Sequence, residues 1–133
     1  MTRRSERGQT AVEFALVIPV MLLFILGIFQ IGVTYFNNEA LQTSARDGAR
    51  AGAIHTGATV AQIQAYVENA VKANAVGLDA SKIQFVPAPS CDGTGQCNQN
   101  ETLTVTVTYP WSIGVMAFSK SGTLTTVTKL RME

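Results

Sequence analysis

The chain has 133 residues, of which 47% are hydrophobic and 14% charged, and its formal net charge is +1. The first eight residues hold three arginines and one glutamate, which leaves seven basic and eight acidic side chains, a net charge of −1, in the remainder. Such a balance provides no strongly basic surface, so nucleic acid is not expected as a partner.

An apolar run without charged residues or histidine covers residues 14–38. As an α-helix, the part from Phe14 to Phe36 would measure about 35 Å, which is enough to cross a hydrocarbon core of about 30 Å. The run continues through Gly27 and Gln30 without a small-x-small cleavage site, so we predict a retained anchor rather than a removed secretion signal. The lipid bilayer is therefore an expected partner.

Basic residues before this run predict its orientation. Arg3, Arg4 and Arg7 are opposed only by Glu6, so the positive-inside rule predicts a cytoplasmic N-terminus and export of everything after the span. The exported part is long enough for one small domain and not for two. We divide the chain into a basic cytoplasmic leader (residues 1–8), a transmembrane helix (9–36), a helix extension (37–57) and a small exported domain (58–133).

Two residues at the start of the span are unfavourable in a membrane helix. A carboxylate at the centre of a span costs about 2.5 to 3.5 kcal/mol, and less near the edge, where Glu13 lies. Two interpretations of Glu13 remain open. Its side chain reaches the headgroups, or it pairs with a free amine that cleavage after Gly8 would create at Gln9, one helical turn away.

Pro19 removes one backbone hydrogen bond, which predicts a kink over residues 15–19.

The helix is expected to continue beyond the span, because residues 37–54 contain no proline and much alanine. Small and apolar side chains recur there at three- and four-residue steps and form one narrow face: Leu41, Ala45, Gly48, Ala49 and Gly52. Such a face allows close approach of another helix, which we favour over a frayed helix end near Gly52 or Gly57.

A second helix is predicted from Thr59 to about Asn74. Thr59 and Gln62 match a capping box, in which their side chains satisfy backbone amides of the starting helix. Apolar residues then recur at helical spacing, and we expect this face to pack on a sheet: Val60, Ile63, Val67, Ala70 and Val71.

Three later segments have strand composition. Residues 83–86 are a candidate first strand, ended by Pro87. Residues 102–109 alternate threonine with apolar side chains, which predicts a strand with one buried face, and Pro110 is expected to end it. Residues 123–132 resume strand composition, with a break in alternation that predicts a bulge and involves Leu124, Val127 and Leu130.

The apolar connection over residues 111–118 has two possible positions. It packs on the core, which we favour because a small domain needs its large apolar side chains, or it lies at the membrane interface, where aromatic residues are common. The predicted fold is α+β: a long N-terminal transmembrane helix extending into a small exported domain, with one packed helix and a short antiparallel sheet.

Cys91 and Cys97 flank a short glycine-containing loop, and in an oxidising exterior such a pair readily forms a disulfide. A metal site is not expected, because two thiolates do not complete a zinc site and the single histidine, His55, has no partner motif. The sequence contains no nucleophile–base motif and no phosphate-binding loop, so neither catalysis nor a cofactor is expected.

The segment Gly-Gln-Thr-Ala-Val-Glu-Phe at residues 8–14 resembles the class III signal of type IV pilins and pseudopilins. The wider stretch over residues 8–32, followed by Ala-Arg-Asp-Gly-Ala-Arg at residues 45–50, resembles the TadE-like pseudopilins of tight-adherence (Flp-type) pilus systems. The C-terminal residues 129–133 are also similar to the usual end of that family.

The resemblance implies that a prepilin peptidase cuts between Gly8 and Gln9 and that Glu13 is the charge used in assembly. Glutamine at the first mature position argues against N-terminal methylation. The implied partners are the peptidase, other pilins and pseudopilins, and an inner-membrane assembly platform. The implied protein is a structural subunit of the inner membrane that primes, caps or assembles a pilus or secretion apparatus. A TadF-like subtype and entry into the surface fibre both remain open, whereas the chain length disfavours a TadG-like subtype.

Two other function classes compete with this interpretation. A single-pass membrane protein with an exported ligand- or partner-binding domain would leave Glu13 incidental. A secreted hydrolase ranks far below, because the catalytic groups are lacking and the N-terminal helix is expected to be retained.

Overall fold

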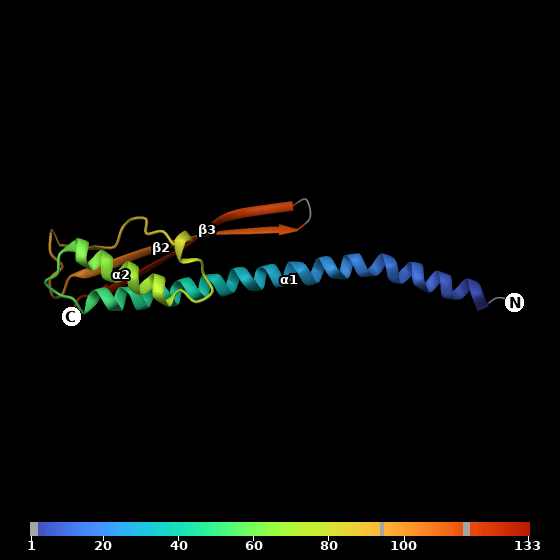
Figure 1. Cartoon of the computed structure of the whole chain (residues 1–133), viewed down its shortest axis with the longest axis horizontal. Coiled ribbons are helices and arrows are strands. Elements are labelled where there is room, and N and C mark those ends of the chain that lie inside the picture. Colours follow the sequence, from blue (N-terminus) through green and yellow to red (C-terminus); the bar gives the residue numbers. More distant parts are fainter. Residues whose placement is uncertain (1–2, 94, 116–117) are drawn as a thin grey trace.

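The computed structural model describes residues 3–93, 95–115 and 118–133, with the side chains of residues 3–7 and 115 left out. Within this part, a helix far longer than the rest of the molecule carries a small domain at its C-terminal end (Figure 1). The side chains of the predicted basic leader and the middle of the predicted 111–118 connection lie outside the described residues. The architecture is α+β, as predicted.

The long helix α1 (Arg3–Ala53) runs without interruption through the predicted span and its extension. Residues 8–26 are exposed throughout, and an 18-residue window of the helix reaches a mean hydropathy of 2.7. Length and composition therefore make α1 a membrane-spanning candidate and suggest a single membrane anchor. Beyond the helix end, Gly57 has a φ of +81°, a conformation that favours glycine.

The second helix α2 (Val60–Asn74) begins with the predicted capping box. The Thr59 N–H donates to Gln62 Oε1 at 3.1 Å, and the Gln62 N–H donates to Thr59 Oγ1 at 3.4 Å. The predicted packing partner needs correction, because α2 lies chiefly against α1 rather than on the sheet. A β-carbon on Gly52 would lie 2.7 Å from Val67 Cγ2 of α2, so the small-residue face of α1 brings the helices close together.

The sheet has three antiparallel strands in the order β1 (Ser90–Cys91), β2 (Thr102–Val115) and β3 (Phe118–Arg131). The predicted strand at 102–109 is confirmed, since these residues belong to β2 and pair with β3, and the apolar residues of their inner face lie in the core. The core consists of small and apolar residues from α1, the apolar stripe of α2 and this strand face, including Leu41, Ala45, Ala49, Ile63, Val67, Val71, Leu103, Val105 and Val107.

The prediction that Pro110 ends the strand is wrong, since β2 continues to Val115 and Pro110 pairs with Thr123. The N–H and carbonyl of Thr108 bond to Gln84, on the side away from β3. Backbone groups alternate sides along a strand, so the nitrogen of Pro110 also faces away from β3. Its missing N–H therefore costs no bond of the β2–β3 ladder.

Two further strand predictions are wrong. Residues 83–86 form only a single bridge, between Gln84 and Thr108. The chain pairs with β2 again only at Ser90, opposite Thr104. It covers six residues between these two pairings (90 − 84) where β2 covers four (108 − 104), so the segment bulges away and no continuous ladder forms. The predicted bulge in β3 is absent from the β2–β3 register, which is continuous from Thr102↔Arg131 to Val115↔Phe118. Val127 breaks the apolar alternation because it lies on the exposed face.

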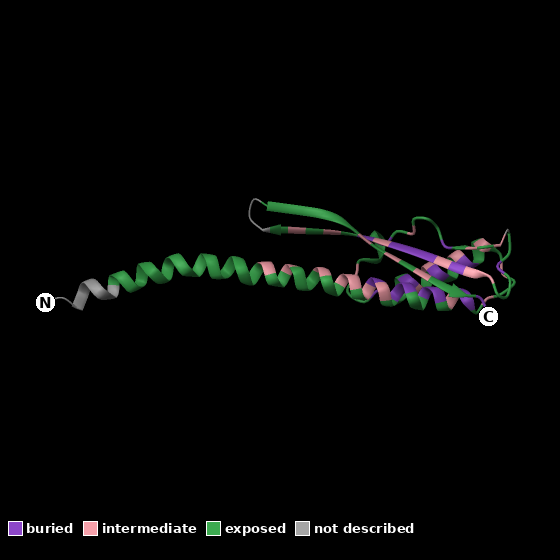
Figure 2. Cartoon of the chain, turned by 180° about the vertical axis from the view of Figure 1, so that it is seen from behind, coloured by how far each residue is buried: buried purple, intermediate pink, exposed green. Residues whose placement is uncertain are grey.

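The apolar connection at 111–118 is the end of the β2–β3 hairpin, and its preferred placement on the core is wrong for the described side chains. Trp111 and Ile113 are half-buried, and Phe118 is 85% exposed. The hairpin runs back along α1 and away from the buried part of the domain (Figure 2). Away from the core, α1 lies beside the strand pair, so residues such as Ile113 are only half-buried and Phe118 stays exposed.

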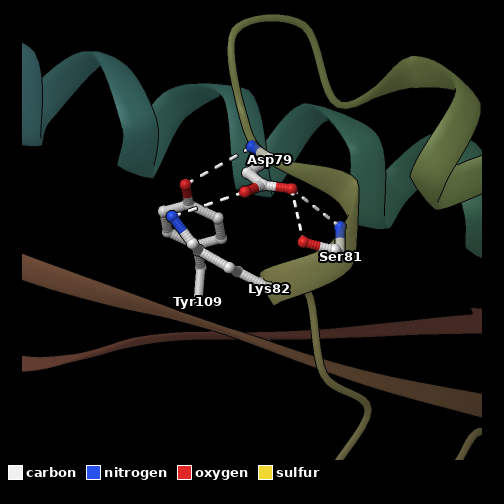
Figure 3. Close-up of polar contacts among 4 residues, drawn as sticks. All are labelled: Asp79, Ser81, Lys82 and Tyr109. Carbon is white, nitrogen blue, oxygen red and sulfur yellow. Dashed lines mark hydrogen bonds and ion pairs between the residues drawn. The ribbon is translucent and has the colours of Figure 1, made fainter.

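A polar cluster links the segment after α2 to the sheet (Figure 3). Asp79 caps the 3₁₀ helix η1 (Ala80–Lys82), accepting from the Ser81 backbone N–H at 3.0 Å and the Ser81 hydroxyl at 2.6 Å. The Asp79 N–H donates to Tyr109 Oη at 3.4 Å. Hydrogen bonds from the Ser81 side chain and backbone, followed by the Lys82 ammonium, lower the pKa of Asp79 below its ordinary value.

Candidate functional site

The predicted cleavage point between Gly8 and Gln9 lies near the N-terminal end of α1. Both residues are exposed, and a β-carbon on Gly8 would meet no atom within 4 Å. The glycine is therefore not required by packing within the chain. Glycine destabilises a helix interior by about 1 kcal/mol relative to alanine, so it weakens α1 at this point.

Gln9 and Glu13 lie one helical turn apart, and their side chains interact. Gln9 Nε2 donates to Glu13 Oε1 at 3.3 Å, and both side chains are exposed on α1. This spacing allows an amine at Gln9 to lie close to the same carboxylate. The charge pair and its role in assembly stay predictions.

Pro19 lies within α1, one turn after Ala15. A shallow apolar hollow of about 240 Å³ surrounds it, lined by Pro19, Leu22, Leu23 and Leu26. All these side chains are exposed, as expected for a surface that faces lipid or another apolar helix. The predicted kink at Pro19 stays a prediction.

A comparison with protein families matches this N-terminal helix. The sequence profile of a family described as TadE-like protein matches residues 8–50. Residues 8–50 form a TadE-like family domain. No curated protein and no solved structure gives a significant match to the chain.

The TadE-like domain begins at Gly8 and ends at Arg50, so it lies entirely within α1. It contains the apolar span and most of the small-residue face that packs on α2. It also contains Arg46 and Asp47, which are exposed and line a groove of about 340 Å³ between α1 and β3, together with Arg50, Thr128 and Leu130. The domain therefore contains both the candidate membrane span and one wall of the core.

The predicted disulfide joins Cys91 at the end of β1 to Cys97. Cys97 is fully buried, and its backbone binds the connection between the helices: its N–H donates to Ala58 O at 3.0 Å, and its carbonyl accepts from the Gly57 N–H at 2.7 Å. The disulfide loop thus ties β1 to the α1–α2 connection.

His55 stacks on Tyr66, with ring centroids 3.9 Å apart, and its Nδ1 lies 2.8 Å from Ala51 O. Through these two contacts, His55 joins the C-terminal end of α1 to α2 and has a structural role in their packing. In the part of the chain that the structure describes, no three His, Cys, Asp or Glu side chains gather into a potential metal site.

Sequence reasoning missed one contact of the span. Gln30 Nε2 donates to the carbonyl of Gly114, at 2.6 Å, and so joins α1 to the end of the hairpin. The sequence did contain a signal for this contact. Between Phe14 and Phe36 the polar side chains are the Gln30 amide and two hydroxyls, those of Thr34 and Tyr35, and the amide is the most polar of the three. An amide in an apolar helix is costly unless it finds a partner.

Proposed function

We propose that the chain is a TadE-like pseudopilin, a structural or assembly subunit of a tight-adherence (Flp-type) pilus or a related secretion apparatus. The observation that carries this proposal is the match of residues 8–50 to the TadE-like family, because that stretch includes Gly8, Gln9 and Glu13 at the start of an exposed apolar helix. The proposed role is non-enzymatic: the helix anchors the subunit, and the C-terminal domain supplies a surface for assembly.

In this proposal the N-terminus lies in the cytoplasm and the C-terminal domain is exported, because three arginines precede the span. A prepilin peptidase removes residues 1–8 at the cytoplasmic face, where the basic leader holds the scissile bond. The mature subunit then meets other pilins, pseudopilins and the inner-membrane assembly platform while its helix remains in the bilayer.

The test is the intact mass of the full chain after co-expression with the prepilin peptidase of the same cell. Cleavage after Gly8 should leave 125 residues, which is 133 minus 8. Gly8→Val should block cleavage. Gly27→Val is the matched control, because Gly27 lies in the same helix with equally free space around its α-carbon, and it should be cut normally.

A mature protein that keeps residues 1–8 in the presence of its peptidase would contradict the proposal. That result would favour the other class of function, a single-pass membrane protein whose exported domain binds a ligand or partner.

A further inference from the structure

The β2–β3 hairpin extends further along α1 than the rest of the C-terminal domain does. The segment after α2 reaches α1 at Phe36, where a β-carbon on Gly77 would lie 2.8 Å from the Phe36 ring. The hairpin continues toward the N-terminal end of α1 (Figures 1 and 2) and contacts Gln30 through Gly114. Gln30 precedes Phe36 by six residues, or about 9 Å along the helix axis.

This position can be compared with the thickness of a bilayer. A hydrocarbon core of about 30 Å corresponds to about 20 helical residues. If the core begins beside Phe14, it ends beside Thr34, and if it begins as early as Gln9, it ends beside Phe29. Gln30 lies between these limits. The hairpin end is therefore level with the boundary between hydrocarbon and headgroups.

The Gln30 contact also satisfies a backbone group that would otherwise be exposed at this depth. Gly114 has the same parity along β2 as Thr108, whose carbonyl faces away from β3. The carbonyl of Gly114 therefore lies on the free edge of the hairpin, where the ladder provides no donor. An unsatisfied carbonyl is costly near lipid, and Gln30 supplies the missing donor.

The side chains near the hairpin end suit a lipid interface. Phe118 is 85% exposed, Ile113 is half-buried, and Lys120, which pairs with Ile113 across the strands, is exposed. An exposed phenylalanine ring buries its apolar surface at the boundary between headgroups and acyl chains, and lysine there reaches the phosphates. An apolar hollow of about 370 Å³ lies between hairpin and helix, lined by Ile31, Thr34, Tyr35, Asn38, Ile113 and Leu124.

We propose that residues 113–114 of β2 and 118–120 of β3 are a second membrane contact, inserted among the lipid headgroups of the exported leaflet beside α1. The proposal rests on the membrane placement of α1 given under the proposed function. Two points of attachment, the helix and the hairpin end, would set the height and orientation of the domain above the bilayer.

The test uses fluorescence of the full chain in vesicles of phosphatidylcholine and phosphatidylglycerol. Trp111 is the single tryptophan of the sequence, so Trp111→Phe gives a background in which one new tryptophan reports its own depth. Phe118→Trp reports on the hairpin end, Phe24→Trp on the middle of the span, and Ile54→Trp on the far end of α1. All three original side chains are exposed. Vesicles carry nitroxide lipids labelled near the headgroup or near the acyl-chain end.

The Phe118→Trp reporter should lose more fluorescence to the nitroxide near the headgroup than to the one near the chain end. The Phe24→Trp reporter should be quenched more by the nitroxide near the chain end than by the one near the headgroup. The Ile54→Trp reporter should be quenched by neither nitroxide lipid and fully by acrylamide in the aqueous phase. Circular dichroism and an intact disulfide confirm that each variant is folded.

If the Phe118→Trp reporter behaves like the Ile54→Trp reporter while the Phe24→Trp reporter remains deep, the hairpin contact is refuted and the membrane placement of α1 stands. The Phe118→Trp reporter could instead be protected from acrylamide and yet be quenched by neither nitroxide lipid. That result would show that the hairpin contacts protein, such as a second copy of the chain, and would also refute the lipid contact. A Phe24→Trp reporter that no nitroxide lipid quenches would overturn both the placement and the hairpin contact.

Discussion

Gly48 of α1 lies directly against Val71 of α2, so close that a β-carbon on the glycine would overlap the Cγ2 methyl of the valine. The carbonyl oxygen of Val67 lies only 3.1 Å from the same point. A rotamer change could move the valine methyl, but the backbone carbonyl cannot yield without a shift of α2. The two helices therefore approach at a distance that only glycine permits.

Gly48→Ala should destabilise the domain. The added methyl overlaps the Val71 side chain and presses on the Val67 carbonyl, so its cost lies at the upper end of the range of about 1 to 3 kcal/mol for overpacking. The gain of about 1 kcal/mol in helix propensity offsets only part of that cost. Urea unfolding of the full chain in detergent micelles, followed by the single tryptophan, measures the change. Thr43→Ala, at an exposed position of the same helix, should be neutral or slightly stabilising. Equal stability of Gly48→Ala and the original chain would refute this packing.

Reduction of Cys91–Cys97 should weaken the domain without unfolding it. A bond that closes so short a loop removes little entropy from the unfolded chain and contributes at most about 2 to 3 kcal/mol. Unfolding curves with and without reductant measure this difference. The double variant Cys91→Ser, Cys97→Ser should be insensitive to reductant. Two alkylatable thiols in unreduced protein from its native compartment would show that the bond does not form there.

Glu13→Ala should insert into the membrane at least as well as the original chain and yet fail to join the pilus components. Removing the carboxylate relieves the insertion cost and deletes the proposed pairing with the Gln9 amine together. Crosslinking and co-purification measure assembly beside a check of N-terminal cleavage. Glu39→Ala is the control, an exposed glutamate of the same helix beyond the apolar run.

Glu13→Gln should be intermediate or equally defective, because it keeps the shape but not the charge. Normal cleavage and normal complex formation in Glu13→Ala would favour a side chain that merely reaches the headgroups.

Acid should weaken the attachment of η1 through Asp79. Ser81 and then Lys82 lower the pKa of Asp79 in the folded state. The stability that the Asp79 carboxylate contributes is therefore fully present above the unfolded pKa near 3.8, and it is lost as the pH falls through the lower pKa of the folded state. Asp79→Asn should therefore lose less stability than the original chain as the pH falls below about 4. Asp92→Asn, an exposed aspartate of the disulfide loop, serves as control. Parallel pH curves for the original chain and Asp79→Asn would contradict this role.

Local patterns account for the part of the fold that the sequence predicted. The Thr59–Gln62 capping box and the alternation over residues 102–109 each involve neighbouring residues, so no knowledge of the tertiary structure was needed. The small-residue face around Gly48 predicted a partner helix. It did not identify α2, because shape alone does not distinguish a helix of the same chain from another subunit.

The errors arose where tertiary structure decides. Pro110 interrupts a strand only if its missing amide would have faced a partner, and the sequence does not tell which edge of β2 is free. The contact between Gln30 and Gly114 joins residues 84 positions apart, so no local pattern contains it. At the candidate site, the roles of Gly8 and Glu13 came from family resemblance and stay predictions, while their placement on one exposed helix was predictable from the apolar run.

The unbroken course of α1 from Arg3 to Ala53 has a mechanical consequence. One rod of about 77 Å contains both the candidate membrane span and a wall of the core. Within the described residues no loop separates the two parts, so the domain cannot swivel freely relative to the span. A force that draws the helix along its axis would load the α1–α2 and α1–sheet contacts in shear, and a rotation of the helix would turn the domain with it. Motion at the base is thus transmitted directly to the distal end.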